Sequence, residues 1–157
     1  MNKESQGGII IVVSILVSII LMLIPLPDSI RLLRPEWVVL ALIYWTMATP
    51  RQVSVGYAWA VGLIMDLIMG GALGVFAFCY ALIIYIVSVV HLRLRQYPIW
   101  QQTVSIFSLM LLMQLLLLLI TPRTIDWSFG LPVISSTLIW PLNYVFLRSL
   151  RRTFHVS

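Results

Sequence analysis

The sequence predicts an all-helical integral membrane protein with six membrane-spanning helices. Hydrophobic residues make up 61% of the 157 residues and charged residues only 10%, whereas soluble globular proteins have about 45–50% and about 25%. The mean hydropathy is +1.05. A spanning helix needs about 20 apolar residues, so a chain of this length holds about five to seven of them. This composition excludes a soluble enzyme, a nucleic-acid-binding domain and a disordered tail.

Prolines and glycines set the limits of the apolar runs. Pro25 and Pro27 end the first run, and Pro35 opens the second at the first helical position. We expect the first run to be an uncleaved helix rather than a signal peptide, because it is long and no Ala-x-Ala site follows it. The prediction is a single domain, 1–157, with helices at about 8–24, 36–49, 52–70, 75–90, 98–120 and 131–147.

The second run is short for a spanning helix. Its fourteen residues reach about 21 Å, against a hydrocarbon core of about 30 Å. Two interpretations remain open: the membrane thins there, or Ile30–Leu33 extend the helix through a kink at Pro35. The 23-residue fifth run is long instead, so we expect that helix to tilt.

Arginine and lysine side chains predict the orientation. Six helices place both termini on one side. On that side lie seven bases: Lys3, Arg51, Arg93, Arg95, Arg148, Arg151 and Arg152. On the other side lie three: Arg31, Arg34 and Arg123. Bases concentrate on cytoplasmic loops, so both termini are predicted to be cytoplasmic. This bias explains the net charge of +5 without nucleic acid.

The basic rim is our name for Arg93, Arg95, Arg148, Arg151 and Arg152. Each base near the surface gains about 1 kcal/mol from anionic lipid. Anionic lipid is therefore the expected partner of the rim, and an acidic patch on a cytoplasmic protein is the alternative.

A stripe of small residues recurs every fourth position in the third run. Its members are Ser54, Ala58, Gly62, Asp66 and Gly70, and Gly74 continues the spacing into the following turn. Residues four apart share a helix face, and small residues allow another membrane helix to approach closely. The stripe therefore predicts packing against a helix of the same chain, or docking of another protein.

Asp66 is the one acidic residue well inside a predicted span. A charge at mid-membrane costs about 3 kcal/mol on insertion scales, so it needs a partner, a proton or water. Three interpretations remain open. Asp66 bonds amides of the turn near Gly70 and Gly71, or it contacts a partner or another helix, or it is a proton or ion site.

The remaining polar residues predict structure rather than catalysis. Pro141 predicts a kink in the sixth helix. Gln114 and Asn143 predict interhelical hydrogen bonds, or a polar ligand cavity shared with Asp66. Motifs of zinc proteases, serine hydrolases and phosphate loops are absent, and the single cysteine, Cys79, has no metal-binding companions. We therefore expect no enzymatic activity, no cofactor and no metal.

Two segments resemble a known family. The first is Arg34-Pro35-Glu36-Trp37, which Tyr44-Trp45 follow, and the second is Gly62-x3-Asp66-x3-Gly70-x2-Leu73-Gly74. Together they resemble the signatures of the rod shape-determining protein MreD family, in which Arg34, Pro35 and Trp37 belong to the motif. Trp100-Gln101-Gln102 and Trp140-Pro141 fit as well.

The resemblance implies a non-enzymatic scaffold subunit of the bacterial inner membrane. Such a subunit binds MreC and helps couple MreB filaments to lateral peptidoglycan synthesis by RodA and its partner transpeptidase, and so to rod shape. The resemblance leaves self-association open. The family's fold is in turn similar to the six-helix substrate-binding subunits of energy-coupling-factor transporters. The alternative function is therefore a small-solute-binding membrane transporter subunit.

Overall fold

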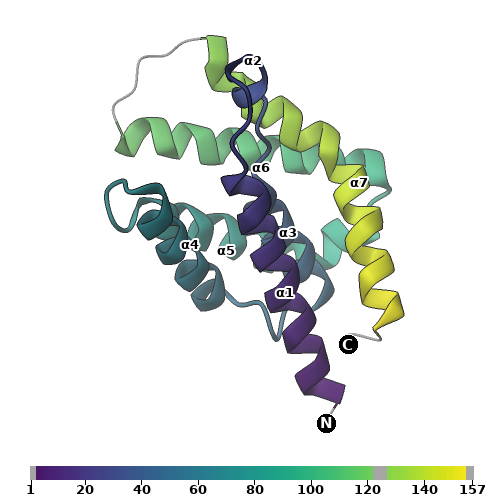
Figure 1. Ribbon diagram of the computed structural model, residues 1–157. Coiled ribbons are helices and arrows are strands. Elements are labelled where there is room, and N and C mark those ends of the chain that lie inside the picture. The colour runs from purple at the N-terminus through teal and green to yellow at the C-terminus, as the bar shows by residue number, and fades with distance from the viewer. Residues whose placement is uncertain (1–2, 122–126, 155–157) are drawn as a thin grey trace.

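The computed structural model describes residues 3–121 and 127–154, apart from the side chains of residues 3–6. The side chain of Lys3 and all of Arg123, two of the bases counted above, lie outside the described residues. Within those ranges the chain is all-helical, as predicted (Figure 1). The elements are α1 (Lys3–Leu23), α2 (Asp28–Arg31), α3 (Trp37–Ala48), α4 (Val55–Met69), α5 (Val75–Gln96), α6 (Ile99–Ile120), the 3-10 helix η1 (Trp127–Gly130) and α7 (Leu131–Thr153).

Each of the six predicted runs corresponds to one helix, α1 and α3–α7. The helices α5 and α7 each continue six residues beyond the predicted ends at 90 and 147. Among the described residues, three helices are long and apolar enough to cross a membrane: Val75–Gln96, Ile99–Ile120 and Trp127–Thr153. Three shorter apolar helices are Gly7–Leu23, Trp37–Ala48 and Val55–Met69.

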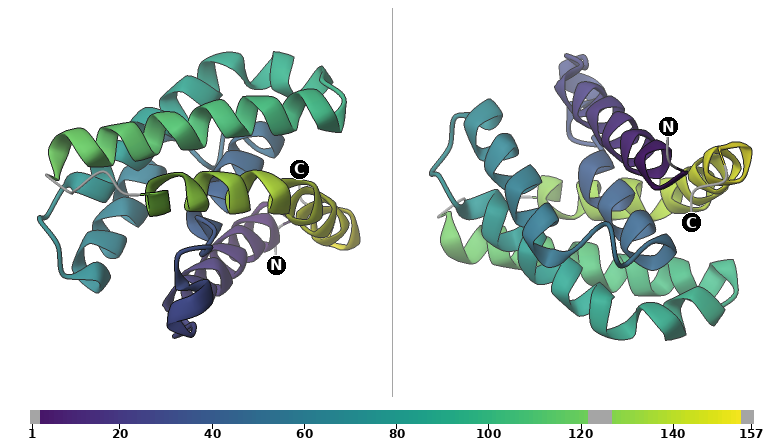
Figure 2. Two further views of the ribbon diagram at one scale, coloured as in Figure 1. Left: turned by 90° about the horizontal axis from the view of Figure 1, so that it is seen from above. Right: turned by 90° about the horizontal axis from the view of Figure 1, so that it is seen from below.

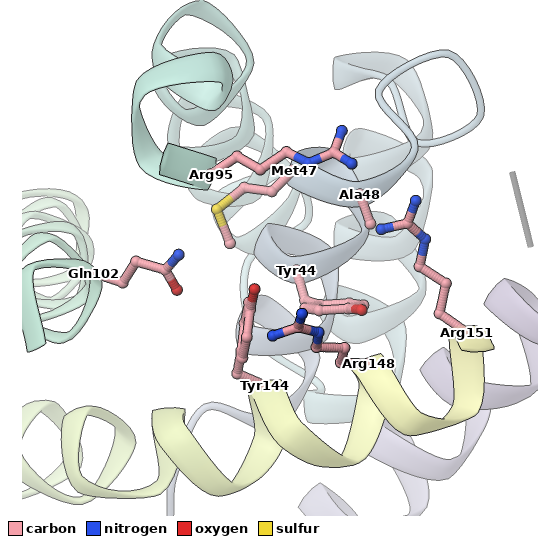
Figure 3. A pocket seen from close by; sticks show the side chains of 8 residues that line it. All are labelled: Tyr44, Met47, Ala48, Arg95, Gln102, Tyr144, Arg148 and Arg151. Atoms are coloured by element: carbon pink, nitrogen blue, oxygen red, sulfur yellow. The ribbon is translucent and has the colours of Figure 1, made fainter. Parts of the chain in front are cut away.

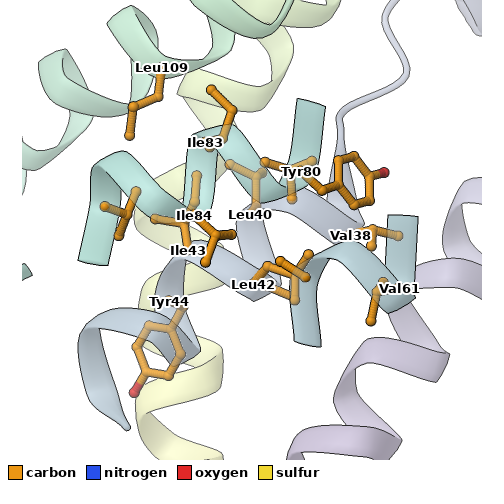
Figure 4. Close-up of a cluster of buried hydrophobic side chains, with 14 of the residues drawn as sticks. Val38, Leu40, Leu42, Ile43, Tyr44, Val61, Tyr80, Ile83, Ile84 and Leu109 are labelled. Atoms are coloured by element: carbon orange, nitrogen blue, oxygen red, sulfur yellow. The ribbon is translucent and has the colours of Figure 1, made fainter. Parts of the chain in front are cut away.

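Helix α3 is the centre of the molecule. Every residue from Val38 to Met47 is buried, because α1, α5 and α7 pack around the helix. Figure 4 shows apolar side chains of α3 meeting those of neighbouring helices. A helix that is apolar all round belongs in a core. Other helices of the chain, α1, α5 and α7, therefore cover the sides of α3. Residues Asp28–Arg31 form the separate turn α2 and do not extend α3 through Pro35.

Helix α1 packs on α3 through one stripe. The buried residues are Ile11, Ser14, Ile15, Ser18, Ile19 and Met22. The indole Nε1 of Trp45 donates a hydrogen bond of 2.8 Å to the Ser14 hydroxyl, which ties the two helices together. The opposite face of α1 is apolar and exposed.

Consecutive helices run back and forth between two ends of the molecule. In Figure 1, α1 begins and α7 ends toward the lower right, on the same side as the α5–α6 turn, while α2 and the α4–α5 turn lie toward the upper left. Figure 2 shows α5 and α6 side by side as a hairpin. Helix α7 packs on α6 and contains Pro141 in its interior.

Candidate functional site

Asp66 closes the junction between α4 and α5. Its side chain is 1% exposed and accepts three backbone hydrogen bonds from the start of α5. The Gly74 amide donates to Oδ2 over 2.9 Å, the Phe76 amide to Oδ1 over 2.9 Å and the Ala77 amide to Oδ2 over 3.1 Å. The first amides of a helix lack partners within it, and its N-terminus attracts negative charge. Gly74 is the N-cap residue of α5 and has no side chain that could cap the helix. The Asp66 carboxyl group caps it instead.

Gly62 permits the approach that this capping needs. A Cβ atom added at Gly62 would lie 2.4 Å from the Ala77 Cα and 2.8 Å from the Phe76 carbonyl oxygen. Real Cβ atoms do not approach a neighbouring backbone so closely. The backbones of α4 and α5 are therefore in direct contact one turn before Asp66, in the most extensive helix pair of the described chain.

The rest of the stripe has other roles. Ala58 is buried. Ser54 caps the start of α4 by accepting a hydrogen bond of 3.4 Å from the Tyr57 amide. Gly70 and Gly74 have φ values of 66° and 98°, a conformation that suits glycine and that ends α4 and begins α5. The buried part of the stripe thus faces a helix of the same chain, and a partner meeting α4 would contact its other face.

The segment Arg34–Trp37 joins α3 to two other elements. The guanidinium of Arg34 donates to the carbonyl oxygen of Ile24, at the end of the α1 segment. The Glu36 amide donates a 2.9 Å hydrogen bond to the Ser136 hydroxyl of α7. Pro35 precedes the helix instead of opening it, because α3 begins at Trp37 with Glu36 as its N-cap.

A pocket of about 300 Å³ lies beside this segment. We call it the outer pocket, because Arg31 and Arg34 are predicted to lie on the outer side of the membrane. Its polar lining comes from Arg31, Arg34, Glu36, Gln114 and Ser128. Its apolar lining comes from Leu32, Phe76, Leu117, Leu118, Phe129 and Pro132. Gln114 thus lines a pocket with Arg34 and Glu36, and neither Asp66 nor Asn143 lines that pocket.

Glu36 stands between α2 and α3, outside the apolar helices. Burial raises the pKa of its carboxyl group to about 7, against the opposing effect of the Arg34 charge. Its Oε2 atom and the Nε atom of Arg34 are buried and have no hydrogen-bond partner in the described part of the chain. The pocket therefore presents one acceptor and one donor that a bound group could satisfy.

A second pocket, the basic pocket, has a volume of about 190 Å³ and lies near the opposite ends of the helices (Figure 3). Its lining residues are Tyr44, Met47, Ala48, Arg95, Gln102, Tyr144, Arg148 and Arg151. Three members of the basic rim, Arg95, Arg148 and Arg151, line this pocket. Arg93 lines a separate pocket between α5 and α6, and Arg152 is exposed on α7. The sequence analysis assigned Tyr44, Gln102 and Tyr144 to no pocket, although Tyr44 and Gln102 belong to segments that resemble the family.

The sequence matches the family described as "rod shape-determining protein MreD" over residues 3–150. The chain belongs to the MreD family. It is also 33% identical over 140 residues to the rod shape-determining protein MreD of Haemophilus influenzae, covering 87% of this chain and 86% of that protein. No solved structure matches it.

Membership in the MreD family gives this chain a role in determining cell shape and an association with the membrane. The matched region contains the α4–α5 junction, the outer pocket and all of the basic pocket except Arg151.

Proposed function

We propose that this chain is a non-enzymatic scaffold of the bacterial inner membrane that binds MreC and helps couple MreB filaments to lateral peptidoglycan synthesis by RodA and its transpeptidase. The observation that carries the proposal is the family match over nearly the whole chain. The MreD proteins are named for rod shape, and rod shape requires that wall synthesis be positioned along the cell.

The proposal includes six crossings of the membrane with both termini in the cytoplasm. Support comes from the alternating direction of the helices (Figure 1) and from the two groups of bases. Arg95, Arg148 and Arg151 line one pocket, whereas Arg31 and Arg34 line the other. On α6 these pockets are marked by Gln102 and Gln114–Leu118, which at 1.5 Å per residue are about 18–24 Å apart.

The exposed apolar faces of α1 and α4 are two of the surfaces that the membrane helix of MreC could contact; α5, α6 and α7 expose apolar side chains as well. On α1 the exposed face includes Val13, Leu16 and Ile20, and on α4 it includes Ile64 and Leu67. Lipid tolerates added bulk at such positions, whereas a packed helix interface does not.

Affinity purification of the tagged full-length chain with MreC tests the proposal. We expect MreC to co-purify and its capture to fall with either Leu16→Trp or Ile64→Trp, the other variant serving as the matched control. Cells that lack the chain should become round, and wild-type protein should restore rods. No capture of MreC by wild-type protein, together with rods in cells lacking the chain, would refute the scaffold function.

The outer pocket favours a second candidate, a small-solute-binding subunit like those of energy-coupling-factor transporters. Its Glu36 and Arg34 atoms without partners suit a polar solute. A ligand that binds only the folded state raises the unfolding temperature. A panel of vitamins and other small polar solutes should raise it in wild-type protein but not in Glu36→Gln if this function holds. An unchanged unfolding temperature across the panel counts against it.

A further inference from the structure

We propose that the basic pocket binds the headgroup of an anionic glycerophospholipid, by its phosphodiester and a free hydroxyl group. This inference goes beyond the scaffold function and does not depend on MreC.

Three guanidinium groups converge on the basic pocket from two helices. Arg95 comes from α5, and Arg148 and Arg151 come from α7 (Figure 3). No carboxylate belongs to the lining among the residues that the structure describes. Guanidinium groups repel one another at short range and bind phosphate oxygens in a planar, bidentate manner. A phosphate in the pocket would offer its oxygens to guanidinium groups from both α5 and α7.

Aromatic side chains lie beside two of the three guanidinium groups, those of Arg148 and Arg151. The Arg148 guanidinium carbon lies 6.0 Å from the centre of the Tyr144 ring, at the limit of a cation–π contact. Tyr144 packs edge to face on Tyr44, with ring centres 5.6 Å apart, and Tyr44 is close enough to Arg148 and Arg151 to interact with their charges. These contacts place the Arg148 guanidinium beside the aromatic wall of the pocket.

Gln102 adds a requirement that an ionised phosphodiester by itself does not meet. The side chain is 3% exposed, and its Nε2 donates to the carbonyl oxygens of Leu94 and Tyr97 over 3.0 and 3.2 Å. These two bonds fix which atom is the oxygen. The Oε1 atom is then a buried acceptor with no partner in the described part of the chain. An ionised phosphodiester has no hydrogen to donate, but the hydroxyl groups of a glycerol headgroup do.

The location of the pocket favours a lipid as the molecule that supplies the phosphodiester and the hydroxyl group. The pocket lies where α3 and α5 end, α6 begins and α7 leaves the apolar region, which is the level at which headgroups lie beside a membrane protein. A volume of about 190 Å³ has room for a phosphate and a small alcohol, while the acyl chains remain in the bilayer. Lipid is also present at high local concentration, unlike a soluble glycerol phosphate.

Native mass spectrometry of the detergent-purified full chain with phosphatidylglycerol tests the site. The variant Arg95→Gln/Arg148→Gln removes two charges from the pocket. The matched control Arg93→Gln/Arg152→Gln removes two charges from the same rim outside the pocket. We expect at least tenfold weaker lipid retention in the pocket variant and less than twofold change in the control. Equal loss in the two variants would show diffuse attraction to the rim and overturn the site.

Two further arms define the ligand. Phosphatidylmethanol carries the same charge as phosphatidylglycerol but no headgroup hydroxyl, so we expect weaker retention of it; equal retention would overturn the role of Gln102. Soluble glycerol 3-phosphate at the concentration of the lipid should not displace it, and displacement would overturn the lipid assignment. Arg95→Gln alone, at an exposed position, repeats the comparison if the double variant does not fold.

Discussion

At the α4–α5 junction, the position of the Asp66 carboxyl group depends on Gly62, which has no side chain. Asp66 reaches the amides of α5 only because Gly62 lets the two backbones touch. The Asp66 carboxyl group accepts three backbone hydrogen bonds, so partners within the chain meet its need for donors. The structure combines two of the sequence interpretations of Asp66, because the Gly74 amide belongs to the turn whereas the Phe76 and Ala77 amides belong to another helix, α5.

Gly62→Ala should separate α4 from α5. The added Cβ would lie 2.4 Å from the Ala77 backbone, and overpacking of this kind costs about 1–3 kcal/mol. Gly56→Ala on the same helix is the control, because its Cβ would meet only the Ser54 hydroxyl at 3.8 Å. Thermal unfolding of the purified variants measures the difference. Equal unfolding temperatures for the two variants would contradict the close approach.

Asp66→Leu should be more damaging than Asp66→Asn. Leucine removes all three acceptor bonds, and each hydrogen bond to a charged group contributes about 1.5–3 kcal/mol. Asparagine keeps one oxygen but turns an NH2 group toward at least one α5 amide. We expect inserted but unstable protein with leucine and partial restoration of rod shape with asparagine. The control Asp28→Asn changes a fully exposed side chain and should have no effect; full function of Asp66→Leu would contradict the capping role.

Glu36 should make the stability of the protein depend on pH. Burial raises the pKa of its carboxyl group from 4.5 to about 7, so the folded state holds this proton more tightly than the unfolded state does. The free energy of unfolding therefore falls as pH rises from about 4.5 to about 7. Glu36→Gln should remove that part of the slope in unfolding temperature against pH. Identical slopes in the two proteins would show that Glu36 does not carry it.

A site formed by residues of a single helix can be predicted from the sequence, whereas a site formed by residues of several helices cannot. The spacing of Gly62 and Asp66 follows from the geometry of a single helix. The basic pocket instead brings together Tyr44, Gln102 and Tyr144 from α3, α6 and α7, and no local pattern connects them. Arg95, Arg148 and Arg151 were predicted to share a side of the membrane, but not to share a pocket.

At the scale of elements, hydropathy located the helices but not their polar ends. Helix α5 runs to Gln96 through the turn that carries Arg93 and Arg95, because Leu94 is buried there and Pro98 stands just beyond the helix end. Helix α7 likewise continues past Leu147 through its arginines. The predicted ends coincide with the last continuous apolar residues, whereas the helical hydrogen bonds continue through amphipathic turns.

The position of α3 in the core of the molecule cannot be derived from its own sequence. Composition shows that α3 is apolar on all sides, which fits a lipid-exposed span as well as a core helix. The packing of α1, α5 and α7 around it decides between them. This burial depends on contacts far apart in the chain, such as the bond from Trp45 to Ser14.

Ser14→Ala should loosen α1 from α3. The Trp45 side chain is fully buried, and without the hydroxyl its N–H has no acceptor, which costs about 1–3 kcal/mol. Ser18→Ala is the control, because the Ser18 hydroxyl donates to the Ser14 carbonyl within α1 and joins no second helix. Proteolysis of the α1–α2 connection should accelerate in Ser14→Ala alone. Equal rates in both variants would contradict a role for the interhelical bond.

At the scale of the whole molecule, the two pockets mark two chemically different ends. The basic pocket has three arginines, while the outer pocket has two arginines together with a carboxylate. The first end therefore carries the stronger positive charge, and it is the end near which α1 begins and α7 finishes (Figure 1). An excess of arginine marks the cytoplasmic side of membrane proteins, so the grouping of these same arginines in the structure fits the orientation proposed from the sequence.

Cysteine labelling of intact spheroplasts tests this orientation. The native Cys79 is fully buried and would be replaced by alanine to give a cysteine-free background. New cysteines at Ala72, exposed in the α4–α5 turn, and at Gln96, exposed at the end of α5, lie at opposite ends of one helix. Gln96 lies 21 residues after Val75, the first residue of α5, which corresponds to about 32 Å along the helix, enough to span the hydrocarbon core. A membrane-impermeant thiol reagent should label Ala72→Cys in intact spheroplasts and Gln96→Cys only after permeabilisation. The reverse pattern would invert the molecule, and it would place the basic pocket at the outer leaflet.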